Sequence, residues 1–513
     1  MQEETTVLPG DLAQCHAVIL EMADTIRELK ILNEKHKHQL AQLLRYRYGQ
    51  RSDRMHSEQL VLWALGEGEP APESSERNEQ EPTGKGRRRR GHGRRPLPKD
   101  LPRKRVVHDV EAEEKVCPQC EVEKKKIGEE TSEQLDYVPA SFYVIEHVHP
   151  KYACPHCQQG VVQGTKPMQP IEKGIPGPGL LAHVVTSKFA DHLPLYRLEG
   201  IFSRYGVDIA RSTMCGWLLE CGKLLEPLYD RMRSQVLCSK VIFTDDTPVP
   251  VQDKKRTKTR TGRIWVYAGD REHPYTVYDY TPDRSRDGPV RFLEGYEGYL
   301  QADAYPGYDG LYQSGRITEV ACWAHVRRKY VEAELAHPVH AAIAVAWIRR
   351  LYRIEKVSKE MNAISRKALR KEKASPLLDA FKAWLDQAVL EVLPKSPLAQ
   401  AMGYTLSNWD ALRRYLEDGN LEIDNGRAER AMKPTALGRK NWLFFGSDRG
   451  GRTAAILNSF TYTCKDLGID PFGYLRDVFE RISAHPMRRL DELLPDRWLA
   501  ARICREPDRA IGA

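Results

Sequence analysis

Apolar residues recur every seven positions between Leu12 and Leu43. One series is Leu12, Ile19, Ile26, Asn33 and Leu40, and a second, three residues later, is Cys15, Met22, Leu29, His36 and Leu43. Such a seam over more than four repeats predicts a coiled coil, and a polar Asn33 within it favours a paired, in-register dimer. An amphipathic helix packed within its own chain is the alternative. We expect a coiled coil over residues 8–48 that supports self-association as a homodimer or a higher oligomer.

The apolar period disappears between residues 66 and 105. Residues 66–81 collect acidic side chains among Gly, Pro and Ser, whereas residues 85–105 collect Lys and Arg. Both halves are predicted to be a disordered linker. The basic half is either a solvated spacer or an arm that lies along phosphates. Its candidate DNA-binding residues are Arg87, Arg88, Arg89, Arg90, Arg94 and Arg95.

Two Cys-x-x-Cys pairs follow, within residues 106–170. They are Cys117-Pro-Gln-Cys120 and Cys154-Pro-His-Cys157, separated by a β-like stretch over residues 141–149. Four thiolates in two such turns predict one closed, tetrahedral Zn²⁺ site. The site is expected to be structural, because four protein ligands leave no open position for a substrate. The other seven cysteines are scattered and are expected to be small buried side chains.

Helical periodicity returns over residues 178–236. A helix from His192 to Phe202, a break at Tyr205-Gly-Val-Asp208 and a second helix from Ser212 predict a helix-turn-helix. In this prediction Ser212 caps the second helix, and Arg211 and Ser212 are candidate DNA-binding residues. A plain helical hairpin is the alternative.

Short strands rich in aromatic and β-branched residues begin after residue 238. The expected elements are strands over residues 240–245, 262–268, 275–280, 298–303 and 317–323, with a helix over 288–293 before the fourth strand. Three successive strands, a helix and a returning strand predict the ribonuclease H-like order, a mixed sheet with helices on its faces.

Two acids stand at expected strand ends, Asp245 after the first strand and Asp303 after the fourth. Carboxylates at neighbouring strand ends can share Mg²⁺, and two such ions can clamp an in-line phosphoryl displacement. Glu429 is the candidate third acid. It would lie one turn inside a short helix that Asp424 or Asn425 caps and that Pro434 ends, although an ordinary surface charge is the alternative.

The order of these motifs resembles transposases of the insertion-sequence 66 (IS66) family, a branch of the Asp-Asp-Glu (DDE) enzymes. The resemblance rests on motifs spread along nearly the whole chain. They are Tyr48-Gly-Gln-Arg-Ser-Asp53, the paired Cys knuckles, His192-Leu-Pro-Leu-Tyr-Arg197, Thr244-Asp-Asp-Thr-Pro-Val-Pro250, Leu300-Gln-Ala-Asp-Ala-Tyr305, Cys322-Trp-Ala-His325, Asp424-Asn-Gly-Arg-Ala-Glu-Arg430 and Gly438-Arg-Lys-Asn-Trp-Leu-Phe-Phe-Gly446.

This resemblance implies that Asp245, Asp303 and Glu429 are catalytic and hold two Mg²⁺ or Mn²⁺ ions. The implied activity is metal-dependent cleavage of DNA at the ends of an insertion sequence, followed by 3′-hydroxyl strand transfer into target DNA. It also implies a helical insertion over residues 331–418 between core parts 238–330 and 419–490, a tail over 491–513, and accessory proteins of the same element. Arg430, Lys433, Arg439 and Lys440 are the expected phosphate contacts, and burial is expected for the aromatics of residues 442–445.

Two departures from the family pattern are Asp246 in place of Glu and Gly426 in place of Asn. A slip in strand register would exchange Asp245 with Asp246. Cys322 and His325 match a Cys-x-x-His signature of some related enzymes, but neither is taken as a metal ligand because Trp323 suggests a structural role. A nuclease or resolvase of the same fold and a catalytically decayed DNA-binding regulator are the competing functions.

Amino-acid composition adds only the fold class and the expected location to these predictions. The formal charge of +8 is modest for 513 residues, and the 41% hydrophobic content supplies several cores, so we expect a multidomain α+β protein. No apolar run approaches the roughly 18 residues needed to span a bilayer, and the first residues lack the features of a signal peptide. We expect a cytoplasmic protein that associates with DNA and not with membranes.

Overall fold

The computed structural model describes residues 26–27, 32–33, 141–147, 151–152, 162–163, 168–172, 174–253, 255 and 257–505. Residues 26–27 and 32–33 are helical. The rest of the predicted coiled coil, the charged linker and the four predicted zinc cysteines lie outside the described residues. The chain divides into two compact units, residues 72–148 and the remainder.

Of the smaller unit, residues 141–147 are described, and the strand expected there is absent from them. They form no regular element, and Tyr143 and Val144 are 75% and 94% exposed. Because a strand needs a partner for its backbone groups, β propensity alone does not create one. In the larger unit, β1 (Lys151–Tyr152) pairs antiparallel with β2 (Val162–Gln163).

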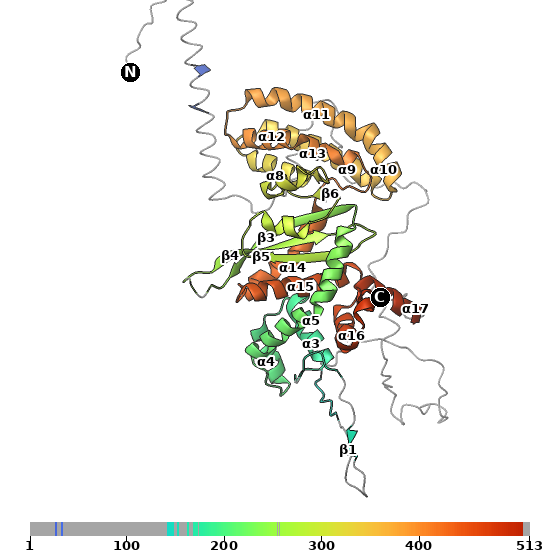
Figure 1. Cartoon of the computed structure of the whole chain (residues 1–513). Coiled ribbons are helices and arrows are strands. Elements are labelled where there is room, and N and C mark those ends of the chain that lie inside the picture. The colour runs from blue at the N-terminus through green and yellow to red at the C-terminus, as the bar shows by residue number, and fades with distance from the viewer. Residues whose placement is uncertain are drawn as a thin grey trace, which may run out of the picture. The chain divides into compact units, whose positions relative to one another are not determined.

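A five-stranded mixed sheet forms the centre of the larger unit (Figure 1). Its strands are β3 (Val241–Val251), β4 (Arg260–Ala268), β5 (Thr276–Thr281), β6 (Gly298–Gln301) and β7 (Ile317–Val320). Their order is β5-β4-β3-β6-β7, with β3 to β5 antiparallel and β3, β6 and β7 parallel. This arrangement is consistent with the expected ribonuclease H-like core.

The first long strand, β3, does not end at Asp245 as expected but continues to Val251. Its parallel pairing with β6 stops at Phe243, while its antiparallel pairing with β4 runs from Phe243 to Val251. Pro248 and Pro250 are tolerated because the second edge of β3 carries no continuous ladder here, only a bridge from Val251 to Phe445 in which Pro250 accepts through its carbonyl oxygen. Asp245 lies just beyond the last residue paired with β6.

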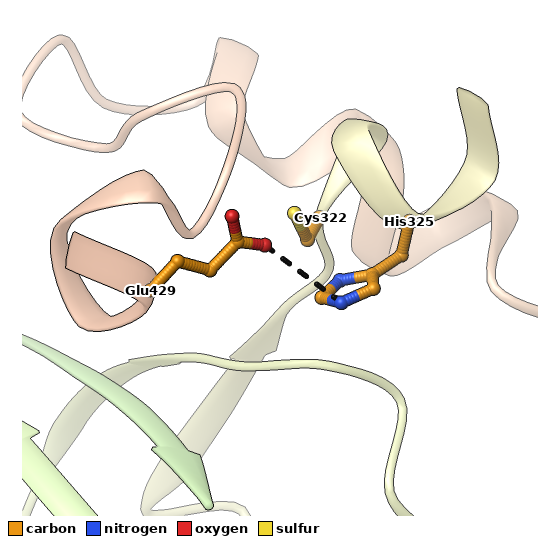
Figure 2. A group of neighbouring side chains, drawn as sticks. All are labelled: Cys322, His325 and Glu429. Atoms are coloured by element: carbon orange, nitrogen blue, oxygen red, sulfur yellow. Dashed lines mark ion pairs between the residues drawn. The ribbon is translucent and has the colours of Figure 1, made fainter. Parts of the chain in front are cut away.

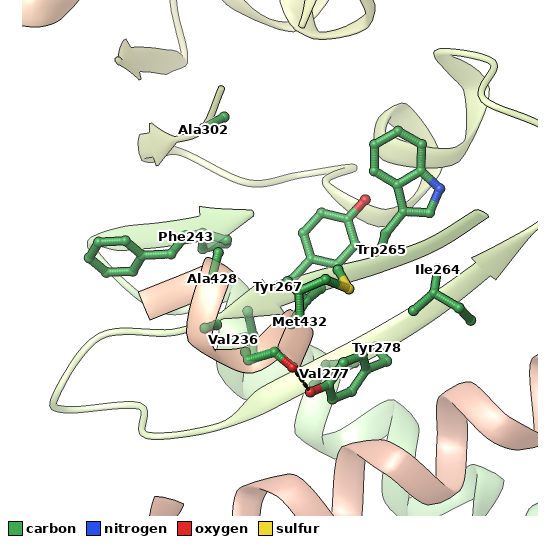
Figure 3. Close-up of a cluster of buried hydrophobic side chains, with 14 of the residues drawn as sticks. Val236, Phe243, Ile264, Trp265, Tyr267, Val277, Tyr278, Ala302, Ala428 and Met432 are labelled. Atoms are coloured by element: carbon green, nitrogen blue, oxygen red, sulfur yellow. Dashed lines mark hydrogen bonds between the residues drawn. The ribbon is translucent and has the colours of Figure 1, made fainter. Parts of the chain in front are cut away.

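Three helices cover one side of the sheet. They are α5 (Arg211–Leu237), α14 (Gly426–Trp442) and α15 (Asp448–Asp466). Figure 3 shows Ala428 and Met432 of α14 among buried aromatics of the strands. Ser459 of α15 accepts a hydrogen bond of 2.8 Å from the backbone N–H of Tyr278, so side chains of this helix satisfy the edge strand β5.

The other side of the sheet carries α6 (Asp287–Phe292) and α7 (Asp309–Tyr312). Phe292 stacks on Tyr267 of β4 at 3.6 Å between ring centroids. Because both rings are almost fully buried, this contact fixes the connection that leads from β5 to β6 and to Asp303.

Helices also fill the segment expected to be a helical insertion. They are α8 (Trp323–Ala333), α9 (Pro338–Ser358), α10 (Ala363–Leu369), α11 (Ser375–Ala388), α12 (Pro397–Ser407) and α13 (Trp409–Arg413), with a π-helical turn at Arg370–Ala374. Arg370, 1% exposed, forms a bidentate ion pair with Glu355 at 2.7 and 2.8 Å. Figure 1 shows these helices together beside the β6 end of the sheet.

The segment expected to be a helix-turn-helix consists of α3 (Pro178–Phe189), α4 (Leu195–Arg204) and the 27-residue α5. Ser212 does not cap α5, because the N-cap is Ala210 and Ser212 lies inside the first turn. Glu199 of α4 instead accepts a hydrogen bond from the backbone N–H of Arg211 at 3.3 Å. The C-terminal half of α5 is buried against β5 and α15, so this helix is continuous with the core.

Two more helices complete the larger unit, α16 (Pro471–Arg481) and α17 (Pro495–Arg505). The first packs on α3. Within the described part of the chain, no helix combines the length and hydropathy that crossing a bilayer requires.

Candidate catalytic and metal site

Asp245 is the acid on the central strand β3. Its own Oδ1 accepts a hydrogen bond of 2.8 Å from the backbone N–H of Asp246. Burial raises the pKa of Asp245 to about 7, and the neighbouring carboxylates of Asp303, Asp246 and Glu429 act in the same direction. Without a cation this carboxyl therefore holds a proton over much of the acidic range, and a divalent ion would replace that proton.

The next residue, Asp246, has a different environment. Arg263 donates to its Oδ2 at 2.7 Å, and Arg284 donates to its Oδ1 at 2.8 Å. The side chain of Asp246 is only 3% exposed. Because two guanidinium groups already satisfy this carboxylate, Asp246 fits an ion-pairing role, and Asp245 is the acid left available for a cation.

Asp303 follows β6, the strand beside β3, by two residues, because β6 ends at Gln301 and not at Asp303 as expected. Burial raises its pKa, partly opposed by His325 and Arg284 and reinforced by Asp246. The Nη2 atom of Arg284 lies 3.9 Å from Asp303 Oδ2. Arg284 therefore holds Asp246 while contributing positive charge beside Asp303.

Glu429 is brought to these acids by the turn before α14. The side chain of Asn425 donates from Nδ2 to the carbonyl oxygen of Thr244, next to Asp245, at 2.7 Å. Gln301 of β6 donates to the carbonyl oxygen of Asp424 at 3.0 Å. These bonds tie residues over 120 positions apart, so the turn that starts α14 is fixed against both acid-bearing strands.

The helix that carries Glu429 is longer than expected. Pro434 does not end it, because α14 continues to Trp442 with this proline inside. A proline within a helix costs roughly 3 kcal/mol, so packing must offset it. Ala431, Met432 and Thr435 are buried around it, and the hydroxyl of Tyr278 donates to the carbonyl oxygen of Ala431 (Figure 3).

The carboxylate of Glu429 lies beside Cys322 and His325. Its Oε1 is 3.8 Å from His325 Nε2, and one ligand atom from each of the three residues lies within 4.8 Å of the others (Figure 2). In the described part of the chain no second group of three such residues meets this spacing, so Asp245, Asp303 and Glu429 do not converge as closely. Burial raises the pKa of the Cys322 thiol to about 12 and lowers the pKa of His325.

The residues around this cluster also correct the expected strand. The strand β7 ends at Val320, Cys322 is the N-cap of α8, and Trp323 is the first residue of that helix. The indole of Trp323 is fully buried and donates to the carbonyl oxygen of Leu412 at 2.9 Å. Trp323 thus anchors the start of α8, which places His325 one turn after Cys322.

Most of the expected phosphate contacts in the described chain face solvent. Arg430, Lys433 and Lys440 of α14 are exposed, as are Arg211 and Ser212 at the start of α5. Arg211 also forms an ion pair of 3.4 Å with Glu199. The arginines of residues 87–95 lie outside the described residues.

Arg439 is different, because its guanidinium turns inward. It donates to the carbonyl oxygen of Pro248 and, at 3.4 Å, to the hydroxyl of Thr247 on β3. This arrangement links the end of α14 to the unpaired edge of β3. Arg439 is therefore a structural contact in this conformation.

Residues 442–445, at the end of α14 and just after it, were expected to be buried, but Leu443 and Phe444 are exposed. Leu443 adopts a left-handed conformation with φ of 66° and is 62% exposed, and Phe444 is 44% exposed. The reversal lets Phe445, 9% exposed, bridge to Val251 and stack on Trp442 at 4.5 Å. Because successive side chains of an extended segment point to opposite sides, burial of Phe445 leaves Phe444 facing outward.

The donor set fits the metals expected from the sequence. Asp245, Asp303 and Glu429 offer carboxylate oxygens, which Mg²⁺ prefers, and burial together with the neighbouring carboxylates raises the pKa of Asp245, as expected of a site that a cation would stabilise. The geometry for Zn²⁺ at Cys117, Cys120, Cys154 and Cys157 lies outside the described residues.

Sequence reasoning missed the residues that hold the site together. Gln301, Asn425 and Arg284 act through contacts that cross the fold, and although Gln301 and Asn425 lie in the quoted motifs, nothing local reveals these contacts. Cys322 and His325 did have a local signal, the Cys-x-x-His spacing. At the start of a helix that spacing places two side chains on the same side of one turn.

Comparison with known proteins adds four family-model matches. Residues 173–453 match a model described as "Transposase IS66 family", and residues 114–158 match "zinc-finger binding domain of transposase IS66". Residues 459–495 match "IS66 C-terminal element", and residues 36–106 match a leucine-zipper model described as "Transposase C of IS166 homeodomain".

Relatives in Sinorhizobium fredii (strain NBRC 101917 / NGR234) extend the similarity over most of the chain. Uncharacterized protein y4jD is 33% identical over 97% of this chain and 98% of its own length. Uncharacterized protein y4hP is 34% identical, covering 80% of this chain and 77% of its own length. Uncharacterized protein y4qI is 37% identical and covers 78% of both chains.

Proposed function

The chain belongs to the IS66 transposase family, and we propose that it cleaves DNA at the ends of an insertion sequence and joins the freed 3′-hydroxyl to target DNA. The observation that carries this proposal is the position of Asp245 on β3 and of Asp303 two residues after β6, the neighbouring strand, with Glu429 close enough to raise the pKa of Asp245. Family membership supports phosphoryl transfer as the reaction class.

In this proposal Asp245, Asp303 and Glu429 hold two Mg²⁺ or Mn²⁺ ions. Bound there, the ions would polarise the scissile phosphate and activate first water and then a 3′-hydroxyl. The protein's own part is to position the carboxylates and the DNA, which accounts for a large share of catalysis in phosphoryl transfer. Asn425 and Gln301 position Glu429, and the ion pair with Arg284 keeps Asp246 from binding a metal ion.

DNA contacts are assigned to cations and to the zinc-finger element. We propose that Arg430, Lys433 and Lys440 bind phosphates beside the site, and that Arg211 and Ser212 do so at the start of α5. The arginines at 87–90, 94 and 95 would hold further phosphates. One structural Zn²⁺ at Cys117, Cys120, Cys154 and Cys157 would shape the element that reads the DNA ends.

Two ends must be brought together, so the active form is proposed to contain at least two protomers. The heptad series over residues 12–43 and the leucine-zipper match support that assembly. Accessory proteins of the same element are further proposed partners.

A joining assay tests the function. Full-length protein, labelled DNA of an element end, a target plasmid and Mg²⁺ should yield label covalently joined to the plasmid. Labelled product that is cut but never joined would indicate the nuclease or resolvase alternative. Binding without any cleavage would indicate the decayed regulator.

A further inference from the structure

Three side chains that bind soft divalent cations meet at the start of two helices. Cys322 is the N-cap of α8, His325 is the third residue of α8, and Glu429 lies in the first turn of α14. Figure 2 shows the thiol, the imidazole and the carboxyl group gathered between these helices. Their ligand atoms all lie within 4.8 Å of one another.

The spacing between the imidazole and the carboxylate is too long for a hydrogen bond and suits a shared ion. A gap of 3.8 Å between His325 Nε2 and Glu429 Oε1 exceeds hydrogen-bond range. Ligand atoms around a tetrahedral zinc ion lie about 3.3–3.7 Å apart, given bonds of about 2.0–2.3 Å. A small inward movement of the side chains would therefore complete three bonds to one ion.

Buried polar atoms without a hydrogen-bond partner also support a bound cation. His325 Nδ1 and Glu429 Oε1 are both buried, and neither makes a hydrogen bond. Leaving such groups unsatisfied is unfavourable, and a bound cation would offset this cost for the carboxylate oxygen. The sulfur of Cys322 accepts a hydrogen bond of 3.2 Å from the backbone N–H of Asn425, so its position is fixed.

We propose that Cys322, His325 and Glu429 bind one zinc-class divalent cation, at a site separate from the four-cysteine zinc finger. One Cys, one His and one carboxylate form a three-ligand set that leaves the fourth position of a tetrahedral ion open. The thiolate and imidazole disfavour Mg²⁺, which prefers oxygen ligands. The cation in this site is therefore chemically distinct from that of the carboxylate centre.

Glu429 is shared between the two sites, a consequence that rests on the proposed function. A carboxylate whose Oε1 binds an ion held by Cys322 and His325 keeps only one oxygen for the magnesium centre of Asp245 and Asp303. Occupancy by Zn²⁺ would therefore weaken that centre and slow DNA joining until the ion leaves.

Zinc content per full-length chain tests the site. We expect wild type to carry one more equivalent of Zn²⁺ than Cys322→Ser, as measured by elemental analysis after removal of loosely bound metal. Cys215→Ser is the matched control, because Cys215 is a free, exposed cysteine outside the cluster, and it should keep the wild-type content. His325→Gln should lose the same equivalent, which keeps the test valid if the buried Cys322→Ser variant does not fold.

Equal zinc content in wild type and in the folded variants would overturn the site. For the shared glutamate, added Zn²⁺ should reduce Mg²⁺-driven joining by about tenfold or more in wild type and Cys215→Ser. Added Zn²⁺ should inhibit Cys322→Ser far less, whatever the joining rate of that variant without zinc. Equal fractional inhibition of wild type and Cys322→Ser would overturn the sharing of Glu429. A wild type that never joins DNA but carries the extra zinc would contradict the proposed function and leave the metal site standing.

Discussion

The side chain of Asn425 donates a hydrogen bond of 2.7 Å to the carbonyl oxygen of Thr244, across 181 positions of sequence. Asn425 precedes the helix of Glu429, and Thr244 precedes Asp245. Asn425 is fully buried, so the bond is shielded from water. It joins the two halves of the core that the helical insertion separates, next to an acid in each half.

Replacing Asn425 with Asp should lower activity and stability together. The substitution turns the donor into a carboxyl oxygen facing a carbonyl oxygen, at a cost of roughly 1–3 kcal/mol. We expect a lower midpoint of chemical unfolding and a roughly tenfold to hundredfold loss of strand joining. Asn420→Asp, at an exposed position nearby, is the control and should match wild type in both measurements.

Thermal unfolding at different pH values tests the burial of Asp245 without any activity measurement. The folded protein keeps a proton on this carboxyl up to about pH 7, whereas the unfolded chain releases it near 3.8. The folded state therefore loses stability as pH rises between these values, by roughly 1–4 kcal/mol in total. In metal-free protein, Asp245→Asn should be more stable than wild type at about pH 8 and should lose this advantage toward about pH 4.

Asp246→Asn should behave in the opposite way, because it removes the partner of Arg263 and Arg284. Leaving buried charges unpaired costs roughly 3–5 kcal/mol, and here less because Arg284 is partly exposed. We expect this variant to be less stable than wild type throughout the neutral range. If Asp245→Asn and Asp246→Asn shifted the melting temperature in the same direction at about pH 8, the distinct environments described for the two acids would be wrong.

The buried pair of Arg370 and Glu355 predicts a non-additive effect in the helical insertion. Arg370→Met alone leaves Glu355 without its bidentate partner and should cost roughly 3–5 kcal/mol of unfolding free energy. The double substitution Arg370→Met with Glu355→Leu should cost less than the single one, because it leaves no unpaired charge. Denaturant unfolding of wild type, both single variants (Arg370→Met and Glu355→Leu) and the double variant measures the difference, and simple additivity would argue against the buried pair.

Substitutions of two neighbouring cations on α14 should have different effects, one on DNA binding and the other on stability. Lys440 is exposed, so Lys440→Ala should weaken DNA binding and reduce the dependence of log affinity on log salt by up to about one unit, without changing stability. Arg439 is bonded to Pro248 and Thr247, so Arg439→Ala should lower stability by about 1 kcal/mol. A stability loss for Lys440→Ala larger than that for Arg439→Ala would reverse this assignment.

How far the sequence predicts this protein depends on whether a feature is local. The five strands follow from aromatic and β-branched runs, although β3 continues past Asp245, and β6 and β7 end before Asp303 and Cys322. Pro434 and Ser212 misled the prediction because tertiary contacts outweighed their usual roles. Packing around Ala431 offsets the proline, and Glu199 of another helix bonds the backbone where Ser212 was expected to cap.

The arrangement of the site depends on contacts that no local pattern reveals. Asp246 and Asp245 are neighbours with the same side chain, and only the positions of Arg263 and Arg284 distinguish them. Glu429 could be picked from the sequence as an acid near a helix start. Its approach to Cys322 and His325 required the fold of the whole insertion.

A switch of metal specificity tests most directly whether the acids at this site hold the catalytic ions. Asp303→Cys replaces a carboxylate with a thiolate, which binds Mg²⁺ poorly and accepts the softer Mn²⁺. With a DNA end that already carries a free 3′-hydroxyl, we expect this variant to lose strand joining in Mg²⁺ and to recover it in Mn²⁺. Asp309→Cys, at an exposed position nearby, should join DNA with either ion. Undiminished joining by Asp303→Cys in Mg²⁺ would contradict the account.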